Sequence, residues 1–113
     1  MDIKKIIDNF SGTFTLCDTE GIATYMNKAS INFFEKDGGE KLIGTNLLDC
    51  HPEPSRSKFE NMMKEEKSNV YMIKKKDKTK LVYQAPVYED GKYTGFMEIM
   101  MELPEDIEVQ ERG

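Results

Sequence analysis

The stretch "DCHPEP" holds the only histidine of the chain and one of its two cysteines, so it is the first place to look for chemistry. Asp49, His51 and Glu53 alternate here with Cys50. A Cys–His pair becomes an activated nucleophile when a third group orients the histidine. Adjacent side chains point apart, however, and nothing in the sequence supplies the orienting group. We therefore expect no catalytic residues and no enzyme.

The same residues give no recognisable metal-binding pattern. Cys17 and Cys50 lie far apart, and neither belongs to a Cys-x-x-Cys spacing. The adjacent pair Cys50 and His51 would need further ligands to hold one ion. We expect no metal site. Because the N-terminus lacks the features of an export signal, we interpret both cysteines as reduced thiols of a cytoplasmic protein.

Composition limits the size of the fold and the class of partner. A length of 113 residues suits one domain, and 38% hydrophobic with 33% charged residues is typical of a soluble globular chain. No apolar run is long enough to span a membrane. The net charge of −5 argues against general nucleic-acid binding. We expect neither a membrane nor a nucleic acid as partner, and we interpret the basic run Lys74–Lys80 as a solvated hairpin turn.

Helix and strand patterns follow one another in a clear order. Apolar residues at helical spacing predict a short amphipathic helix at the N-terminus. Two short alternating runs then predict a β-hairpin, after which Asn27 is suited to cap a helix. Single helical turns follow, and a capping box of Ser57 and Glu60 predicts a longer helix that ends at about Lys67. Three further strands close the pattern, and Asp90-Gly91 marks the last hairpin.

This order predicts an α+β fold. Strands at both ends of the chain, with helices between them, imply a five-stranded antiparallel sheet with helices packed on one face. The N-terminal helix stands outside this arrangement.

Three blocks carry a resemblance to a known family. They are "DTEGIATYMNKA" (18–29), "LIGTNLLD" (42–49) and "PVYEDGKYTG" (86–95). In order and spacing they resemble the first hairpin, the segment before the long helix and the last hairpin of PAS domains. The resemblance implies a flanking helix over 1–11, a PAS domain over 12–103 and an acidic tail over 104–113.

The end of the chain departs from the family pattern. Many PAS domains end in Asp-Ile-Thr and continue into a helix that drives an output domain. Here the matching stretch is "MELPEDI", and Pro104 is poorly suited to carry a helix onward. We expect no kinase, cyclase or DNA-binding output in this chain, which would be either an excised sensor module or a small stand-alone protein.

The strand phase of the family predicts which side chains face a central pocket. Apolar walls with a few polar groups are typical of a ligand site, although a filled core would use the same residues. The predicted lining is Thr15, Cys17, Phe34, Leu42, Leu47, Phe59, Met63, Val82, Gln84, Met97 and Ile99.

The opposite face of the sheet would then be apolar, and it would need a cover. PAS domains dimerise through such a face and the flanking helix, so the resemblance implies a symmetric homodimer. The predicted interface is Ile3, Ile6, Ile7, Phe10, Phe14, Leu16, Leu81, Tyr83, Phe96 and Met100. A one-residue slip near Pro86 or Gly95 would exchange the two faces.

Cofactor predictions depend on the same resemblance. Photoactive flavin members carry Cys directly after the Asn of Gly-x-Asn-Cys, whereas Leu47 follows Asn46 here, so flavin-adduct chemistry is rejected. Haem-binding members use a His near the long helix, which makes His51 a weak candidate for a haem ligand. A surface or capping role for this lone histidine is the alternative.

Three functions therefore stay open from the sequence. The first is a sensor that binds a small apolar or amphipathic molecule and signals to a partner protein through a change in dimer geometry. The second is a ligand-free dimerisation or interaction domain. The third is a haem-based gas or redox sensor.

Overall fold

A computed structural model describes residues 1–113. An α-helix, a strand hairpin and a second α-helix come first, then three single-turn 3-10 helices, a longer α-helix and three strands. In chain order these are α1 (Ile3–Asp8), β1 (Thr13–Asp18), β2 (Ala23–Met26), α2 (Lys28–Phe33), η1 (Glu35–Asp37), η2 (Gly39–Leu42), η3 (Leu47–Cys50), α3 (Ser55–Glu65), β3 (Asn69–Lys75), β4 (Lys78–Glu89) and β5 (Lys92–Leu103).

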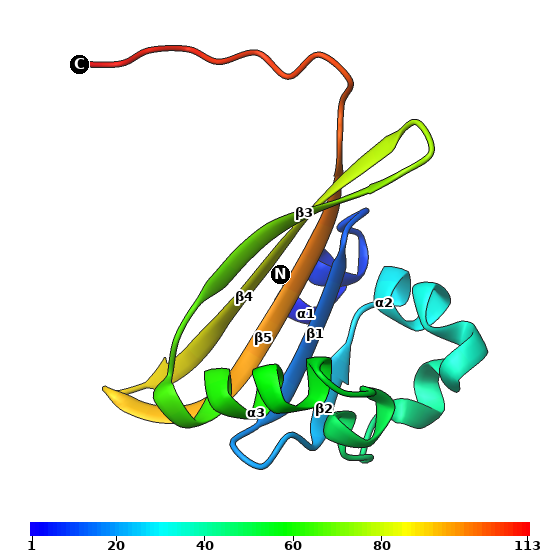
Figure 1. Cartoon of the computed structure of the whole chain (residues 1–113), viewed down its shortest axis with the longest axis vertical. Helices are drawn as coiled ribbons and strands as arrows, with labels where there is room; N and C mark the ends of the chain where they lie inside the picture. The colour runs from blue at the N-terminus through cyan, green and yellow to red at the C-terminus, as the bar shows by residue number, and fades with distance from the viewer.

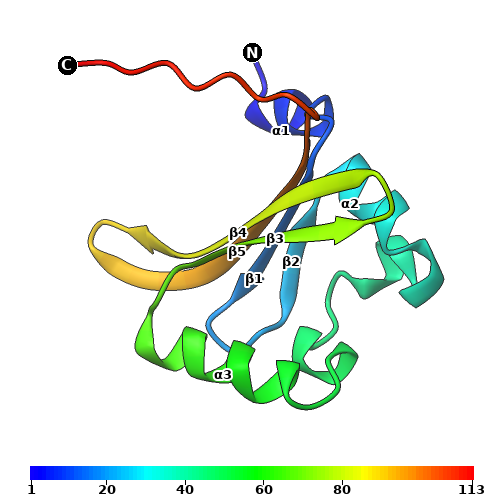
Figure 2. The ribbon, with the colours of Figure 1, turned by 45° about the horizontal axis from the view of Figure 1, so that its top comes forward.

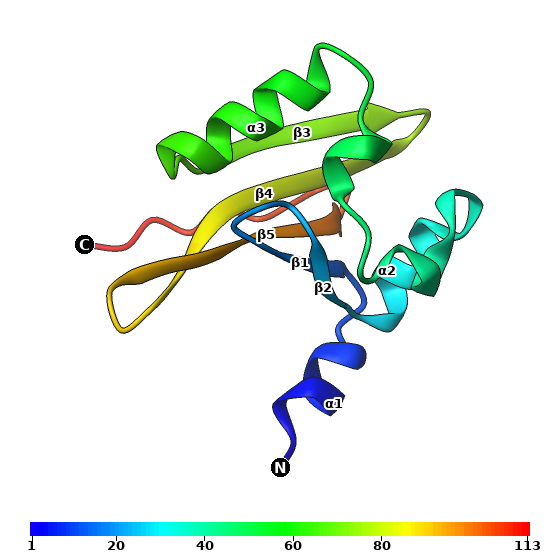
Figure 3. The same cartoon turned by 90° about the horizontal axis from the view of Figure 1, so that it is seen from below.

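The five strands form one antiparallel sheet in the order β2-β1-β5-β4-β3. Helices α2 and α3 and the turns between them pack on one face of the sheet, as Figure 1 shows. Helix α1 lies at the opposite end of the molecule from α3 (Figures 2 and 3). The α+β fold predicted from the sequence is confirmed.

Asn27 joins the N-terminal segment, the first strand and the second helix. Its Oδ1 accepts hydrogen bonds from the N–H of Phe14 at 2.9 Å and of Ser30 at 3.0 Å, so it caps α2 as predicted. Its Nδ2 donates to the carbonyl oxygens of Ile7 and Gly12, each at 3.0 Å. One fully buried side chain thereby fixes where α2 leaves the sheet.

The predicted capping box at the start of α3 is wrong. The helix begins at Ser55, two residues before the predicted cap. The Glu53 carboxylate instead receives hydrogen bonds from the N–H of Ser57 at 2.9 Å and from its Oγ at 2.7 Å. Proline at positions 52 and 54 sets the backbone before the helix, so the chain enters α3 earlier than the Ser–Glu spacing implies.

The β3–β4 hairpin places the basic run where a turn was predicted. Lys75 pairs with Lys78, and only Lys76 and Asp77 lie between the two strands. All of these side chains are exposed. Beyond β5, residues 104–113 contain no helix or strand and extend away from the body (Figure 1). None of the helices combines the length and apolar character needed to cross a membrane.

Cross-strand pairs define the two faces of the sheet. Cys17 pairs with Phe96 and Thr15 with Glu98, so these four side chains share the face that α3 covers. We call this the inner face. Gln84 of β4 pairs with Glu98 and belongs to the same face.

The predicted phase of β5 is therefore wrong by one residue. Phe96 and Met100, predicted outward, alternate with the inner-face residue Glu98 and lie on the inner face. Met97 and Ile99, predicted inward, lie on the outer face. Apart from Glu98, both alternating sets are apolar over residues 96–100, so hydrophobicity did not reveal the correct set. A register shift at Val87/Tyr88 lies near the predicted bulge. It interrupts the strict alternation of inner and outer side chains that was used to predict the phase.

Candidate ligand-binding cavity

A cavity of about 520 Å³ lies between the inner face of the sheet and the helical layer. It is lined by 22 residues, of which 14 are hydrophobic. This volume and this mixture of apolar walls with a few polar groups are typical of small-molecule sites. All five strands and every helical segment except α1 contribute residues to its lining.

Most of the side chains predicted to form a pocket do surround this cavity. Those that line it are Thr15, Cys17, Phe34, Leu42, Leu47, Phe59 and Gln84; Met97 also borders it, although its strand pairing directs its side chain to the outer face. Three others do not line it. Met63 packs in a buried cluster with Cys17, Leu48 and Phe96, Val82 is fully buried, and Ile99 lies on the outer face.

The sequence prediction missed more than half of the lining. The missed residues are Met26, Phe33, Asp37, Cys50, His51, Ser55, Lys58, Met62, Asn69, Tyr71, Ile73, Phe96, Glu98 and Met100. The contribution of β3 could have been found, because Asn69, Tyr71 and Ile73 alternate along one strand. The three residues of β5 were lost with the strand phase. Cys50, His51, Ser55 and Lys58 lie where α3 begins earlier than predicted.

A row of polar side chains crosses the inner face at the cavity. Asn69 Nδ2 donates to Gln84 Oε1 at 3.2 Å, and Gln84 Nε2 donates to Glu98 Oε2 at 2.7 Å. On the next strand, Thr15 pairs with Glu98 and shares a hydrogen bond of 2.6 Å with Ser30 Oγ. These groups can orient a ligand that the apolar walls only enclose.

Known structures resemble this arrangement of sheet and helices, while no protein-family model and no curated protein sequence matches the chain. A C-terminal domain from Streptococcus mutans has a TM-score of 0.73 at 16% identity, over 88% of this chain and 81% of that one. The PAS domain of BvgS from Bordetella pertussis has 0.62 at 12%, over 91% and 85%. The Aer2 receptor from Vibrio cholerae, described as a dual PAS-heme oxygen sensor, has 0.59 at 18%, over 82% and 95%.

The chain has the PAS fold. The resemblance of its three sequence blocks is thereby confirmed at the level of the fold. At these identities the likeness shows the fold alone, so what this protein does must be argued from its own residues.

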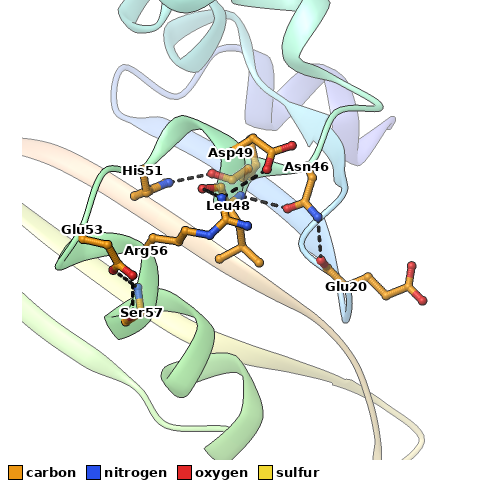
Figure 4. A network of polar contacts seen from close by, with 9 residues as sticks. Glu20, Asn46, Leu48, Asp49, His51, Glu53, Arg56 and Ser57 are labelled. Atoms are coloured by element: carbon orange, nitrogen blue, oxygen red, sulfur yellow. Dashed lines mark hydrogen bonds and ion pairs between the residues drawn. The ribbon is translucent and has the colours of Figure 1, made fainter.

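A network of polar contacts fixes the loop that forms one wall of the PAS cavity (Figure 4). Asn46 Nδ2 donates to the carbonyl oxygen of Glu20 at 3.4 Å, and its Oδ1 accepts from Leu48 N–H at 2.9 Å. Arg56 of α3 donates to the Leu48 carbonyl at 3.1 Å and pairs with Asp49 at 3.2 Å. The loop is thus tied to both the first hairpin and the long helix.

His51 belongs to this loop and lines the cavity. Its Nδ1 lies 2.7 Å from the carbonyl oxygen of Leu47, and its ring packs beside Phe59 with centroids 5.4 Å apart. Because a carbonyl only accepts, Nδ1 must carry the proton, which leaves the lone pair of Nε2 unengaged. No three His, Cys, Asp or Glu side chains gather where they could share a metal ion.

The two thiols at the cavity are poor nucleophiles at neutral pH. Burial, with smaller effects of Asp18 and Glu98, raises the pKa of the Cys17 thiol from 9.0 to about 11. Burial and then Asp37 and Asp49 raise the pKa of Cys50. A thiol whose folded-state pKa is raised stabilises the fold below pH 9, and for Cys17 this contribution is lost as the pH rises toward 11.

The outer face of the PAS sheet is apolar and largely uncovered. One row of cross-strand neighbours runs through Val70, Tyr83, Ile99 and Phe14 on β3, β4, β5 and β1. Val70 keeps 55% of its surface exposed and Tyr83 keeps 38%. Leu16 and Leu81, also predicted for an interface, lie on this face as well, whereas Phe96 and Met100 do not.

Helix α1 covers little of this face. Ile3 is 65% exposed and Ile6 is 46% exposed, while Ile7 and Phe10 are half-buried. The hydroxyl of Tyr25 donates to Asp8 Oδ1 at 3.1 Å, which holds the helix beside β2 rather than across the sheet.

Proposed function

We propose that this PAS domain is a signal-sensing module that binds a small apolar or amphipathic molecule in its cavity. The observation that carries the proposal is the cavity itself, about 520 Å³ with mostly apolar walls and one polar row. A core filled by its own side chains, as a pure interaction domain would have, would leave no space of this size. Under this proposal the module is not an enzyme, acts in the cytoplasm and passes its signal to a partner protein.

Binding would act on the sheet through the residues that line the cavity. The row Asn69–Gln84–Glu98 belongs to three adjacent strands, so a ligand bound to it would bias how β3, β4 and β5 pack. The opposite faces of the same strands form the exposed apolar surface. A ligand that favours one packing of the sheet would thereby favour one geometry of whatever covers that surface.

A native mass spectrum of the protein purified from its own source cells tests the proposal. We expect an excess mass over the denatured chain, because an apolar cavity of this size gains free energy when a ligand fills it. The excess mass gives the class of the bound molecule. A native mass equal to that of the denatured chain, or to a simple multiple of it, would favour the ligand-free interaction domain.

A haem-based sensor is the second candidate, and the contact of His51 favours it. Its Nδ1 carries the proton that is donated to the Leu47 carbonyl, so Nε2 of the neutral ring has a free lone pair that is suited to ligate iron. Haem bound there would supply gas-binding or redox chemistry. The receptor described as a dual PAS-heme oxygen sensor shares the fold. The same mass spectrum identifies this candidate by the characteristic mass of haem. An absorption spectrum of the purified protein would show the visible band of haem as a second test.

We further propose that the outer face forms a symmetric homodimer with the help of α1. Covering several large apolar side chains is worth several kcal/mol at roughly 25 cal/mol per Å². Tyr83 stands in the middle of the row on the central part of the sheet. A Tyr83→Lys substitution should therefore raise the dimer dissociation constant by at least tenfold, measured by sedimentation equilibrium.

Val109 provides the matched control for this substitution. It is apolar and 84% exposed, but it lies in the C-terminal tail away from the sheet. Val109→Lys adds the same charge and should leave dimerisation unchanged. A wild-type protein that stays monomeric throughout the accessible concentration range would overturn the dimer proposal.

A further inference from the structure

Glu98 is an acidic side chain at an unusual place, the inner face of the sheet. It lies between Thr15 on β1 and Gln84 on β4, lines the cavity and is half-buried. Strand positions that face a core are normally apolar, because taking a charge out of water is costly. A carboxylate here requires compensation from neighbouring groups or from a ligand.

Neighbouring groups compensate only part of the carboxylate. Gln84 Nε2 donates to Glu98 Oε2 at 2.7 Å, and Oε1 has no hydrogen-bond partner. Gln84 cannot turn its amide around without losing Asn69, which donates to its oxygen. Each hydrogen bond in the polar row is therefore donated toward Glu98, whose carboxylate is the last acceptor. A carboxylate can accept about four hydrogen bonds, so Glu98 keeps unused acceptor capacity toward the cavity.

No cation of the protein neutralises Glu98. The two ion pairs of the structure are Arg56–Asp49 and Lys67–Glu65. Lys58 is the one Lys or Arg residue that lines the cavity, and its Nζ lies 5.8 Å from the centre of the Tyr71 ring. Asp37, a second carboxylate, also lines the cavity and adds to its negative charge.

Aromatic rings line the same cavity as the Glu98 carboxylate. Five of the lining residues are aromatic: Phe33, Phe34, Phe59, Tyr71 and Phe96. The faces of such rings attract cations, most strongly where water is excluded. An ammonium group would also form a charge-assisted hydrogen bond with the free oxygen of Glu98. Lys58 is the one lining residue whose charge would favour an anionic ligand, and the Nζ of Lys80 lies 4.3 Å from the centre of the lining ring of Phe33.

We propose that the cavity selects an organic cation, a primary or secondary ammonium group on an apolar body, with its N–H groups bound to Glu98. This inference rests on the proposed function, because it names the class of ligand for the same cavity. The apolar body fills the space between the aromatic rings, and the ammonium group supplies the hydrogen bonds and the charge that Glu98 lacks.

A series of three probes with one apolar body tests the charge preference. 4-Phenylbutylamine, 4-phenylbutanol and 4-phenylbutyrate present a cation, a neutral hydroxyl and an anion. Methyl signals of the methionines report where they bind, because Met26, Met62 and Met100 line the cavity whereas Met72 and Met101 lie on the outer face. We expect shifts at the cavity methyls, with the amine binding about tenfold tighter than the alcohol and the acid binding weakest.

Two matched variants locate the source of the preference. Glu98→Gln keeps the shape and a hydrogen-bonding group but removes the charge, so the amine should lose its advantage over the alcohol. Asp37→Asn removes the other lining carboxylate, which is exposed in η1, and should keep the advantage. If Glu98→Gln fails to fold, the comparison of the three probes on the wild-type protein still tests the preference for a cation.

The outcomes separate this inference from the proposed function. Cavity shifts that are equal for amine and alcohol, or strongest for the acid, overturn the selection of a cation and leave the cavity as a ligand site. Loss of the preference in Asp37→Asn alone overturns the role of Glu98. Shifts from none of the three compounds count against the proposed function as well.

Discussion

Replacing Asn27 by alanine should lower the free energy of unfolding by about 3–4 kcal/mol. The side chain is fully buried and makes four hydrogen bonds to backbone groups of three segments. Alanine removes the acceptor of the Phe14 and Ser30 N–H groups, and with it the cap of α2. It also removes the donor to the carbonyl oxygens of Gly12 and Ile7, of which Ile7 keeps the N–H of Phe10 at 3.1 Å. Urea unfolding followed by circular dichroism measures the change as a lower midpoint.

Asn32 provides the control for this substitution. It lies on the same short helix, is exposed and makes no side-chain hydrogen bond. Asn32→Ala should change the unfolding free energy by less than about 0.5 kcal/mol. Equal effects of the two substitutions would mean that Asn27 does not fasten α1, β1 and α2 together.

Replacing Gly95 by alanine should destabilise the protein by about 2–3 kcal/mol and disturb the cavity. A Cβ atom at this position would lie 2.3 Å from the carbonyl oxygen of Cys17 in the neighbouring strand. Backbone cannot move aside as a flexible side chain can, so β1 and β5 must separate locally. Cys17 and Phe96 line the cavity at this point, and their amide signals in an NMR spectrum should shift together with the loss of stability.

Gly91 separates the effect of crowding from the effect of losing a glycine. It lies in the β4–β5 turn with φ +78°, and a Cβ atom there would meet nothing within 4 Å. Gly91→Asn should cost little, because asparagine tolerates positive φ. A Gly95→Ala protein as stable as wild type would contradict the close approach of β1 and β5.

The fold could be predicted from the sequence because its signals are local and agree with one another. Asn27 caps a helix, Asp90-Gly91 turns a hairpin, and three sequence blocks fall in the family order. The N-terminal part of the cavity followed for the same reason, since Thr15 and Cys17 alternate on a regular strand next to the first hairpin.

The phase of β5 depended on information that lies outside the strand. Over residues 96–101 its two alternating sets are both apolar apart from Glu98. Glu98 lies on the inner face, whereas an acidic residue would ordinarily be expected to face solvent. The pairing of Glu98 with Gln84 and Thr15 decides the phase, and such pairing is a property of three strands together. The wall around His51 was missed because α3 begins at Ser55, two residues before the predicted cap Ser57.

The methionine methyl spectrum tests the central claim, that the PAS cavity is a ligand site, most directly. The methionine methyl groups are natural reporters, with three at the cavity and two on the outer face. Titration with a library of small amphipathic molecules should shift the signals of Met26, Met62 and Met100, in a saturable manner, and leave Met72 and Met101 in place. A library that shifts none of the cavity methyls, or that shifts only the outer pair, would contradict the account.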